Sequence, residues 1–197
     1  REFFDDGIAI LQNFKKKKGG HFSKKGWHLV GCEVPIVIAP NMRINRVKYM
    51  GYLDIVMYHE PTNTFKIIDI KTSTKGWGSY AKKDESKQFQ LVLYKYFFSK
   101  QYNIPIESID IEFFIVRRKV YLDGEYPQKR IQTFTPASGK NKVNKATKNL
   151  DDFLNKSFNL DGTYKDTIFN ANPSKWNCSF CPYKENTELC SAVGKNF

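Results

Sequence analysis

The chain has 197 residues, 41% of them hydrophobic and 15% aromatic, which is enough to bury one substantial core and excludes a largely disordered protein. Its 32 Lys and Arg against 20 Asp and Glu give a formal charge of +12, which favours a polyanionic partner such as nucleic acid or an acidic membrane surface. No apolar run reaches the roughly 18 residues of a membrane helix, and the N-terminus is not a signal peptide. We therefore expect no membrane span and an intracellular protein, in the cytoplasm or nucleoid, with a phage origin open.

The first half of the chain predicts one helix and three strands. Residues 3–16 carry apolar side chains at helical spacing, and we expect this amphipathic helix to end in the lysine run 15–18 and the two glycines after it. Because the chain opens in this helix without a Met, we expect a further helix upstream. Segments 29–39, 46–58 and 64–72 are apolar between short turns and predict an antiparallel meander.

The second half predicts two helices and two further strands. After a glycine-rich loop, Asp84 or Ser86 can cap a helix that runs to about residue 100 and covers one sheet face. Segments 109–120 and 130–134 predict strands. Pro136 and Ser138 then introduce a helix with one basic face and an apolar face of Val143, Ala146, Leu150, Phe153 and Leu154. We expect an α/β domain over 1–172, with a mixed central sheet flanked by helices, and a cysteine-bearing tail over 173–197 packed on it.

Two of the predicted strands carry acids that a hairpin would bring together. Asp54 lies on the second strand, and Asp69 ends an apolar run on the third, two residues before Lys71. Because side chains alternate along a strand, Asp69 and Lys71 share a face. Phosphodiester hydrolysis uses hard oxygen ligands for a divalent metal and often a cation near the nucleophile. The pattern predicts a Mg²⁺ or Mn²⁺ site from Asp54, Asp69 and the carbonyl of Ile70; a structural ion-pair cluster is the alternative.

Three motifs occur in order along the chain: Gly51-x-x-Asp54, Asp69-x-Lys71 followed by Thr72-Ser73, and Gln90-x-x-x-Tyr94. Together they resemble the RecB-type branch of the PD-(D/E)xK nuclease superfamily, over residues 29–100. The resemblance implies a restriction-endonuclease-like core with Asp54 and Asp69 as metal ligands and Lys71 as the catalytic lysine. It also implies that Gln90 and Tyr94, one helical turn apart, lie at the active site and the DNA backbone.

Two further positions bear on that resemblance. Glu33 matches a glutamate often found in the first strand of this family, which would support catalysis or ligate metal. Family members also usually carry a His on a helix before the first strand. We read His21, His28 and His59 as exposed loop or strand residues, assign none of them to catalysis, and expect the counterpart upstream of Arg1.

The four cysteines are Cys32, Cys178, Cys181 and Cys190. A gap of two residues lets Cys178 and Cys181 face one metal, and crowding of this kind in an intracellular chain indicates ligation rather than disulfides. By resemblance to exonuclease-branch family members with a four-cysteine cluster, the implied cofactor is a 4Fe–4S cluster. A Zn²⁺ ion and unligated reduced thiols remain alternatives.

The basic residues predict the partner. Arg117, Arg118 and Lys119, with Lys142 and Lys145 on the last predicted helix, would form a phosphate track, because backbone contacts need only positive charge. The resemblance implies a metal-dependent DNA exonuclease acting on linear ends or single strands in recombination, repair or phage-type replication, with a helicase or another recombination or replication protein as a possible partner. A structure-specific endonuclease and a DNA-binding module with a degenerate site are the alternatives.

Overall fold

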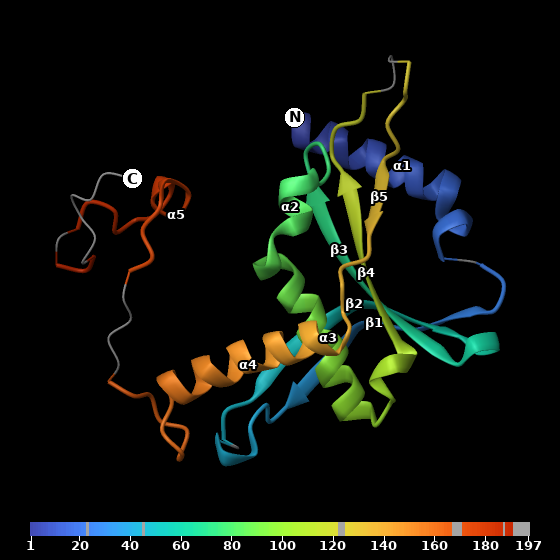
Figure 1. Ribbon diagram of the computed structural model, residues 1–197. Helices are drawn as coiled ribbons and strands as arrows, with labels where there is room; N and C mark the ends of the chain where they lie inside the picture. Colours follow the sequence, from blue (N-terminus) through green and yellow to red (C-terminus); the bar gives the residue numbers. More distant parts are fainter. Residues whose placement is uncertain (23, 45, 122–124, 167–170, 187, 191–197) are drawn as a thin grey trace.

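The computed structural model describes residues 1–22, 24–44, 46–121, 125–166, 171–186 and 188–190. Five strands form one sheet in the order β1-β2-β3-β4-β5 (Figure 1). The first three are antiparallel neighbours, β3 and β4 are parallel, and β5 is antiparallel to β4. The sheet is therefore mixed, as predicted. The strands are β1 (Trp27–Ile38), β2 (Tyr49–His59), β3 (Thr64–Ser73), β4 (Ile109–Arg117) and β5 (Ile131–Phe134).

Helices flank the sheet on both faces. The parallel connection from β3 to β4 passes through α3, which packs on the sheet and against α4, and Figure 1 shows α1 across the opposite face. No helix in the described part of the chain is long and apolar enough to cross a membrane. The helices are α1 (Glu2–Phe22), α2 (Ser79–Lys83), α3 (Glu85–Tyr102), α4 (Lys140–Ser157) and α5 (Lys175–Ser179), with 3-10 turns η1 (Met42–Ile44), η2 (Glu60–Thr62) and η3 (Ile106–Ser108).

Local hydrogen bonds determine the residues at which α3 begins and ends. The carboxylate of Asp84, at the N-cap, accepts a hydrogen bond from the Ser86 backbone N–H, which confirms the predicted cap. At the other end Asn103 adopts a left-handed conformation with φ 53°, and its N–H bonds the Ser99 carbonyl. These caps fix the length of the helix that carries Gln90 and Tyr94 over the sheet.

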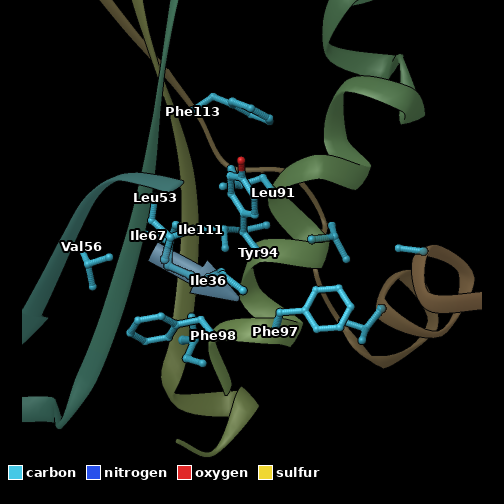
Figure 2. Packing of buried hydrophobic residues seen from close by; sticks show 14 of the residues in the cluster. Ile36, Leu53, Val56, Ile67, Leu91, Tyr94, Phe97, Phe98, Ile111 and Phe113 are labelled. Atoms are coloured by element: carbon cyan, nitrogen blue, oxygen red, sulfur yellow. The ribbon is translucent and has the colours of Figure 1, made fainter. Parts of the chain in front are cut away.

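The main core lies between the sheet and α3. Fifteen buried residues from β1 to β4, α3 and α4 form one cluster, and Figure 2 shows side chains of α3 packed against those of the strands. Phe113 in this cluster is completely buried and packs on the rings of Trp77 and Phe134. Burial on this scale makes the α3 side of the sheet the stable part of the fold.

The opposite face carries a much smaller cluster of Met57, Ile68, Phe114 and Val116. It is covered by α1, whose Phe14, His21 and Phe22 rings lie 5.3–6.0 Å from Phe114. These contacts explain why the predicted end of the helix at the lysine run was wrong: α1 continues through it to Phe22. The aromatic packing outweighs the low helix propensity of the two glycines.

Other elements of the structure differ from the predicted ones, mainly at their ends. The fourth strand ends at Arg117 rather than residue 120, the loop around Trp77 is followed by the short helix α2, and α5 interrupts the tail. Phe153, which was assigned to the apolar face of α4, is 53% exposed and contacts Phe158 edge-on instead. Local spacing misplaced it because the width of the buried face depends on the partner helix.

The outer edge of β1 is partly covered by the end of α3. The Val37 N–H donates to Gln101 Oε1 at 2.8 Å, and the Pro35 carbonyl accepts from both Gln101 Nε2 and the Tyr102 hydroxyl. Side chains thus satisfy backbone groups that an edge strand would otherwise leave open.

Candidate active site

The strands β2 and β3 separate at the two predicted acids. Their ladder ends at the pair Ile55–Ile68, so the next position in register places Asp54 opposite Asp69. There the Ile70 backbone N–H donates to Asp54 Oδ2 at 2.6 Å. A side-chain carboxylate therefore takes the place of a backbone acceptor, and the sheet opens between the acids while β3 stays paired with β4 up to Ser73.

Asp69 and Lys71 face α3. In register with them on β4 are Phe113 and Ile115, both buried in the core on that side. Asp69 is only 3% exposed, and its Oδ2 lies 2.9 Å from Lys71 Nζ in an ion pair. The structure thus confirms that the acid and the lysine share one face.

Ionisation of the Asp69 carboxyl is unfavourable in this structure. Burial raises the pKa of its carboxyl, the ion pair with Lys71 lowers it less, and the neighbouring Asp54 charge raises it further. One lysine therefore does not balance the negative charge that two carboxylates place at this edge. A cation between them would relieve the repulsion and favour the ionised form.

A chain of polar contacts fixes the Lys71 ammonium. Lys71 Nζ donates to Gln90 Oε1 at 3.2 Å, and Gln90 Nε2 donates to the Tyr94 hydroxyl at 3.0 Å. The second bond sets the orientation of the amide, so that its oxygen rather than its nitrogen faces the lysine. Gln90 and Tyr94 lie one turn apart on the same side of α3, as predicted.

Gly51 belongs to the same arrangement. A Cβ at this position would lie 2.7 Å from Tyr94 Cε1 and 3.3 Å from its hydroxyl oxygen. Figure 2 shows Tyr94 within the core, with its hydroxyl at the end of the side chain. The first and third sequence motifs are therefore in direct contact, which local pattern alone does not reveal.

The donor set fits a hard divalent cation. Asp69 Oδ2 is buried with the Lys71 ammonium as its partner, and the hydrogen bond found for Asp54 among the described residues is the one that its Oδ2 accepts from the Ile70 N–H. Two carboxylates with oxygens to spare are the ligands that Mg²⁺ and Mn²⁺ prefer. The residues that would hold such an ion are Asp54, Asp69 and the carbonyl of Ile70.

Glu33 does not join these acids in a larger ligand group. Among the described residues no set of three or more His, Cys, Asp or Glu side chains is placed to hold one metal ion. Glu33 is exposed on β1 and has a left-handed backbone with φ 52°, at the position that the register places across from Asp54. Its predicted catalytic role remains a prediction.

The three histidines lie away from the acids in this structure. His21 is in α1 rather than in a loop, which corrects its predicted location, and burial against Phe114 lowers its pKa. His28 pairs with Glu60, and His59 Nδ1 bonds the Thr62 hydroxyl. The sequence does contain a histidine, His21, on the helix before β1. Its ring contacts Phe114, however, on the face of the sheet opposite to Asp69 and Lys71.

Both predicted groups of basic residues have acidic or backbone partners. Arg118 pairs with Asp6 at 3.2 Å and Lys119 pairs with Glu2, both on α1. Arg117 donates to the Lys129 carbonyl. Any phosphate approaching these residues competes with the acids of α1.

On the other side, Glu85 bridges the predicted α4 residues. Its two oxygens lie 2.5 Å from Lys142 Nζ and 2.5 Å from Lys145 Nζ. These two contacts lower the pKa of Glu85 to about 2. The bridge ties the N-terminus of α3 to α4, so the lysines have a structural role whether or not they bind nucleic acid.

The cysteines do not form a ligand set among the described residues. Cys178 and Cys181 lie on and just after α5, and the Cys181 N–H bonds the Cys178 carbonyl at 3.3 Å. Cys32 is exposed on β1, and Figure 1 shows α5 apart from that strand. The arrangement of the described cysteines does not fit a four-cysteine cluster.

The mixed sheet flanked by helices, with two acids and a lysine at an opened edge, defines the class of restriction-endonuclease-like nucleases. The family model described as "PD-(D/E)XK nuclease superfamily" matches residues 10–186. The chain belongs to this superfamily, whose members are nucleases.

Other comparisons add little to this assignment. No curated protein matches the sequence. A solved structure described as "Crystal structure of SSO0001" is similar to this chain with a TM-score of 0.44 and 16% sequence identity, over 96% of this chain and 69% of the other.

Proposed function

We propose that this protein is a Mg²⁺- or Mn²⁺-dependent DNA exonuclease of the RecB-like type. The observation that carries the proposal is the opened edge between β2 and β3, where Asp54 and Asp69 stand opposite each other and Lys71 is held beside Asp69. Acting on linear ends or single strands in recombination, repair or phage-type replication fits the positive charge of the chain, +12.

Each residue has a distinct task in the proposed reaction. Asp54 and Asp69 hold the divalent ion, which when bound stabilises charge on the phosphate and lowers the pKa of a water molecule. Lys71 has three N–H donors, of which one bonds Gln90 and one faces Asp69. The third is available to orient the attacking water or to stabilise the phosphate.

Gln90 and Tyr94 are positioning residues for that lysine. The Tyr94 hydroxyl accepts from the Gln90 amide and so keeps the amide oxygen directed at Lys71. Tyr94 itself is 8% exposed and anchored in the core. The rigid core on the α3 face thereby fixes the ammonium near the acids.

The test is cleavage of end-labelled linear single-stranded and double-stranded DNA and of covalently closed circles in Mg²⁺, in Mn²⁺ and in EDTA. We expect metal-dependent loss of linear DNA only. Lys71→Ala should reduce the rate by at least about a hundredfold and leave binding of DNA to the metal-free protein largely intact, as measured by fluorescence anisotropy.

Lys148→Ala is the matched control, because the Lys148 side chain is 72% exposed on α4 and pairs with Asp152 one helical turn away. Cleavage by Lys71→Ala at the control's rate would overturn the assignment of the active site. Cutting of circles, which have no ends, would show that the protein is an endonuclease and not an exonuclease. Binding without cutting in any metal would favour a DNA-binding module with a degenerate site.

A further inference from the structure

A cavity with a largely apolar lining and several charged side chains lies away from the acids, between α3, η3 and the start of α4. Its volume is about 520 Å³, within the range of small-molecule sites. Polar groups line one part of it, including Lys95, Lys100, Ser138 and Lys140. Tyr96, Ile106 and Val143 form an apolar wall.

Lys95 is the unusual member of this lining. Lys95 is only 8% exposed, and among the described residues one hydrogen bond is found for its ammonium, to the Ser138 hydroxyl at 3.3 Å. It has no ion pair with a carboxylate in the part of the chain that the structure describes. A buried ammonium with donors to spare is costly unless an anion compensates it.

Burial lowers the pKa of Lys95, while the negative charges of Asp110 and Glu107 raise this pKa by a smaller amount. Glu107 also lines the cavity, so three lysines face one acid there. The excess of positive charge is therefore a property of the cavity and not of one residue.

The start of α4 adds to this positive field. Its N-cap is Gly139, which offers no side-chain acceptor, and its first turn contains no acid. Among the described residues no acceptor is found for the N–H groups of Lys140 and Asn141, and the positive end of the dipole of this 18-residue helix lies at the cavity that Gly139 and Lys140 line.

We propose that this cavity is a binding site for a terminal phosphate monoester of nucleotide size. A terminal phosphate can enter the cavity and present three oxygens to Lys95 and the α4 N-terminus, whereas a phosphodiester within a strand is flanked by sugars on both sides. The apolar wall with Tyr96 accommodates the nucleoside. The free nucleotide and the phosphorylated end of a DNA strand share this chemistry.

The test is isothermal titration calorimetry of the full chain in EDTA, where cleavage is absent, so that its result does not depend on the proposed nuclease activity. The probes are thymidine 5′-monophosphate, thymidine and inorganic phosphate. We expect the monophosphate to bind one site per chain and thymidine to bind at least tenfold more weakly. Lys95→Met should weaken the monophosphate roughly tenfold or more, and the exposed-lysine control Lys148→Met should not.

Lys95→Met keeps the length of the side chain and removes a buried charge, and circular dichroism checks its fold. Ser138→Ala, a milder change at the hydroxyl to which Lys95 donates, should also weaken binding. Equal affinity of wild type and Lys95→Met, equal affinity for thymidine, or no binding at millimolar concentration would each overturn the proposal.

Two oligothymidines, one with a 5′-phosphate and one with a 5′-hydroxyl, identify the source of the phosphate. A preference for the phosphorylated strand that is lost in Lys95→Met assigns the site to a DNA end. Binding of the mononucleotide without that preference assigns it to a free nucleotide.

Discussion

The two faces of the sheet differ in how firmly they are packed. On the α3 face fifteen buried residues surround the side chains that hold Lys71, whereas the α1 face has four buried residues under one helix. On α1 itself Phe4 and Leu11 remain 70% and 67% exposed. The polar contacts of the active site therefore lie on the better packed face of the sheet, whereas α1 on the other face is held by fewer buried side chains.

Phe113 and Phe114 test this difference directly, because they are neighbours on β4 that point to opposite faces. Phe113→Ala should lower the free energy of unfolding by about 3–5 kcal/mol and reduce cleavage, since Phe113 is in register with Asp69. Phe114→Ala should cost about 3 kcal/mol or less, because α1 can shift to fill the space. The measurement is urea denaturation followed by circular dichroism, with cleavage assayed on the folded fraction. Equal loss of cleavage in both variants would contradict the comparison.

Gly51→Ala tests, at the active site itself, whether packing on the α3 face holds the polar contacts of the site in place. The added methyl would overlap the Tyr94 ring, displace the Tyr94–Gln90–Lys71 contacts, and cost about 1–3 kcal/mol of stability. Because no metal ligand is changed, we expect cleavage to fall roughly tenfold to a hundredfold at unchanged metal affinity. Gly7→Ala on α1 is the control, since a Cβ there meets nothing within 4 Å. Wild-type cleavage in Gly51→Ala would rule out the positioning role of Tyr94.

Asp69→Asn should separate stability from activity. A carboxyl whose folded pKa is raised destabilises the folded state as pH rises through that value, so the metal-free protein gains from losing the charge. We expect cleavage to be abolished and the unfolding temperature at pH 7 in EDTA to rise by about 2–4 °C for each kcal/mol gained. Differential scanning fluorimetry measures the shift. A lower unfolding temperature than that of wild type would mean that the ion pair with Lys71 stabilises the fold.

The smallest expected effect is at the bridge between α3 and α4. The pKa of Glu85 is lowered from 4.5 to about 2, so its contribution to stability is present above pH 4.5 and is lost as pH falls toward 2. Glu85→Gln should therefore unfold at a slightly lower temperature at pH 7 and at the wild-type temperature near pH 2. The difference should also shrink in 1 M salt. A difference that persists unchanged in acid would indicate a role other than charge.

The sequence predicted the meander, the cap of α3 and the shared face of Asp69 and Lys71, because each of these depends on residues close in sequence. The extension of α1 to Phe22 was missed, since it depends on contact with the Phe114 ring of β4, which no helical spacing encodes. The contact of Gly51 with Tyr94 and the pairing of Arg118 with Asp6 join residues far apart in the chain. Such contacts become visible only when the sheet is assembled.

The cover that Gln101 and Tyr102 place on β1 has a consequence for assembly. An exposed edge strand of 12 residues is a template on which a strand of a second molecule can be added. Here the backbone groups of Pro35 and Val37 are already bonded within the chain. The end of the helix that positions the active site thus also closes the Pro35–Val37 part of the β1 edge to the addition of another strand.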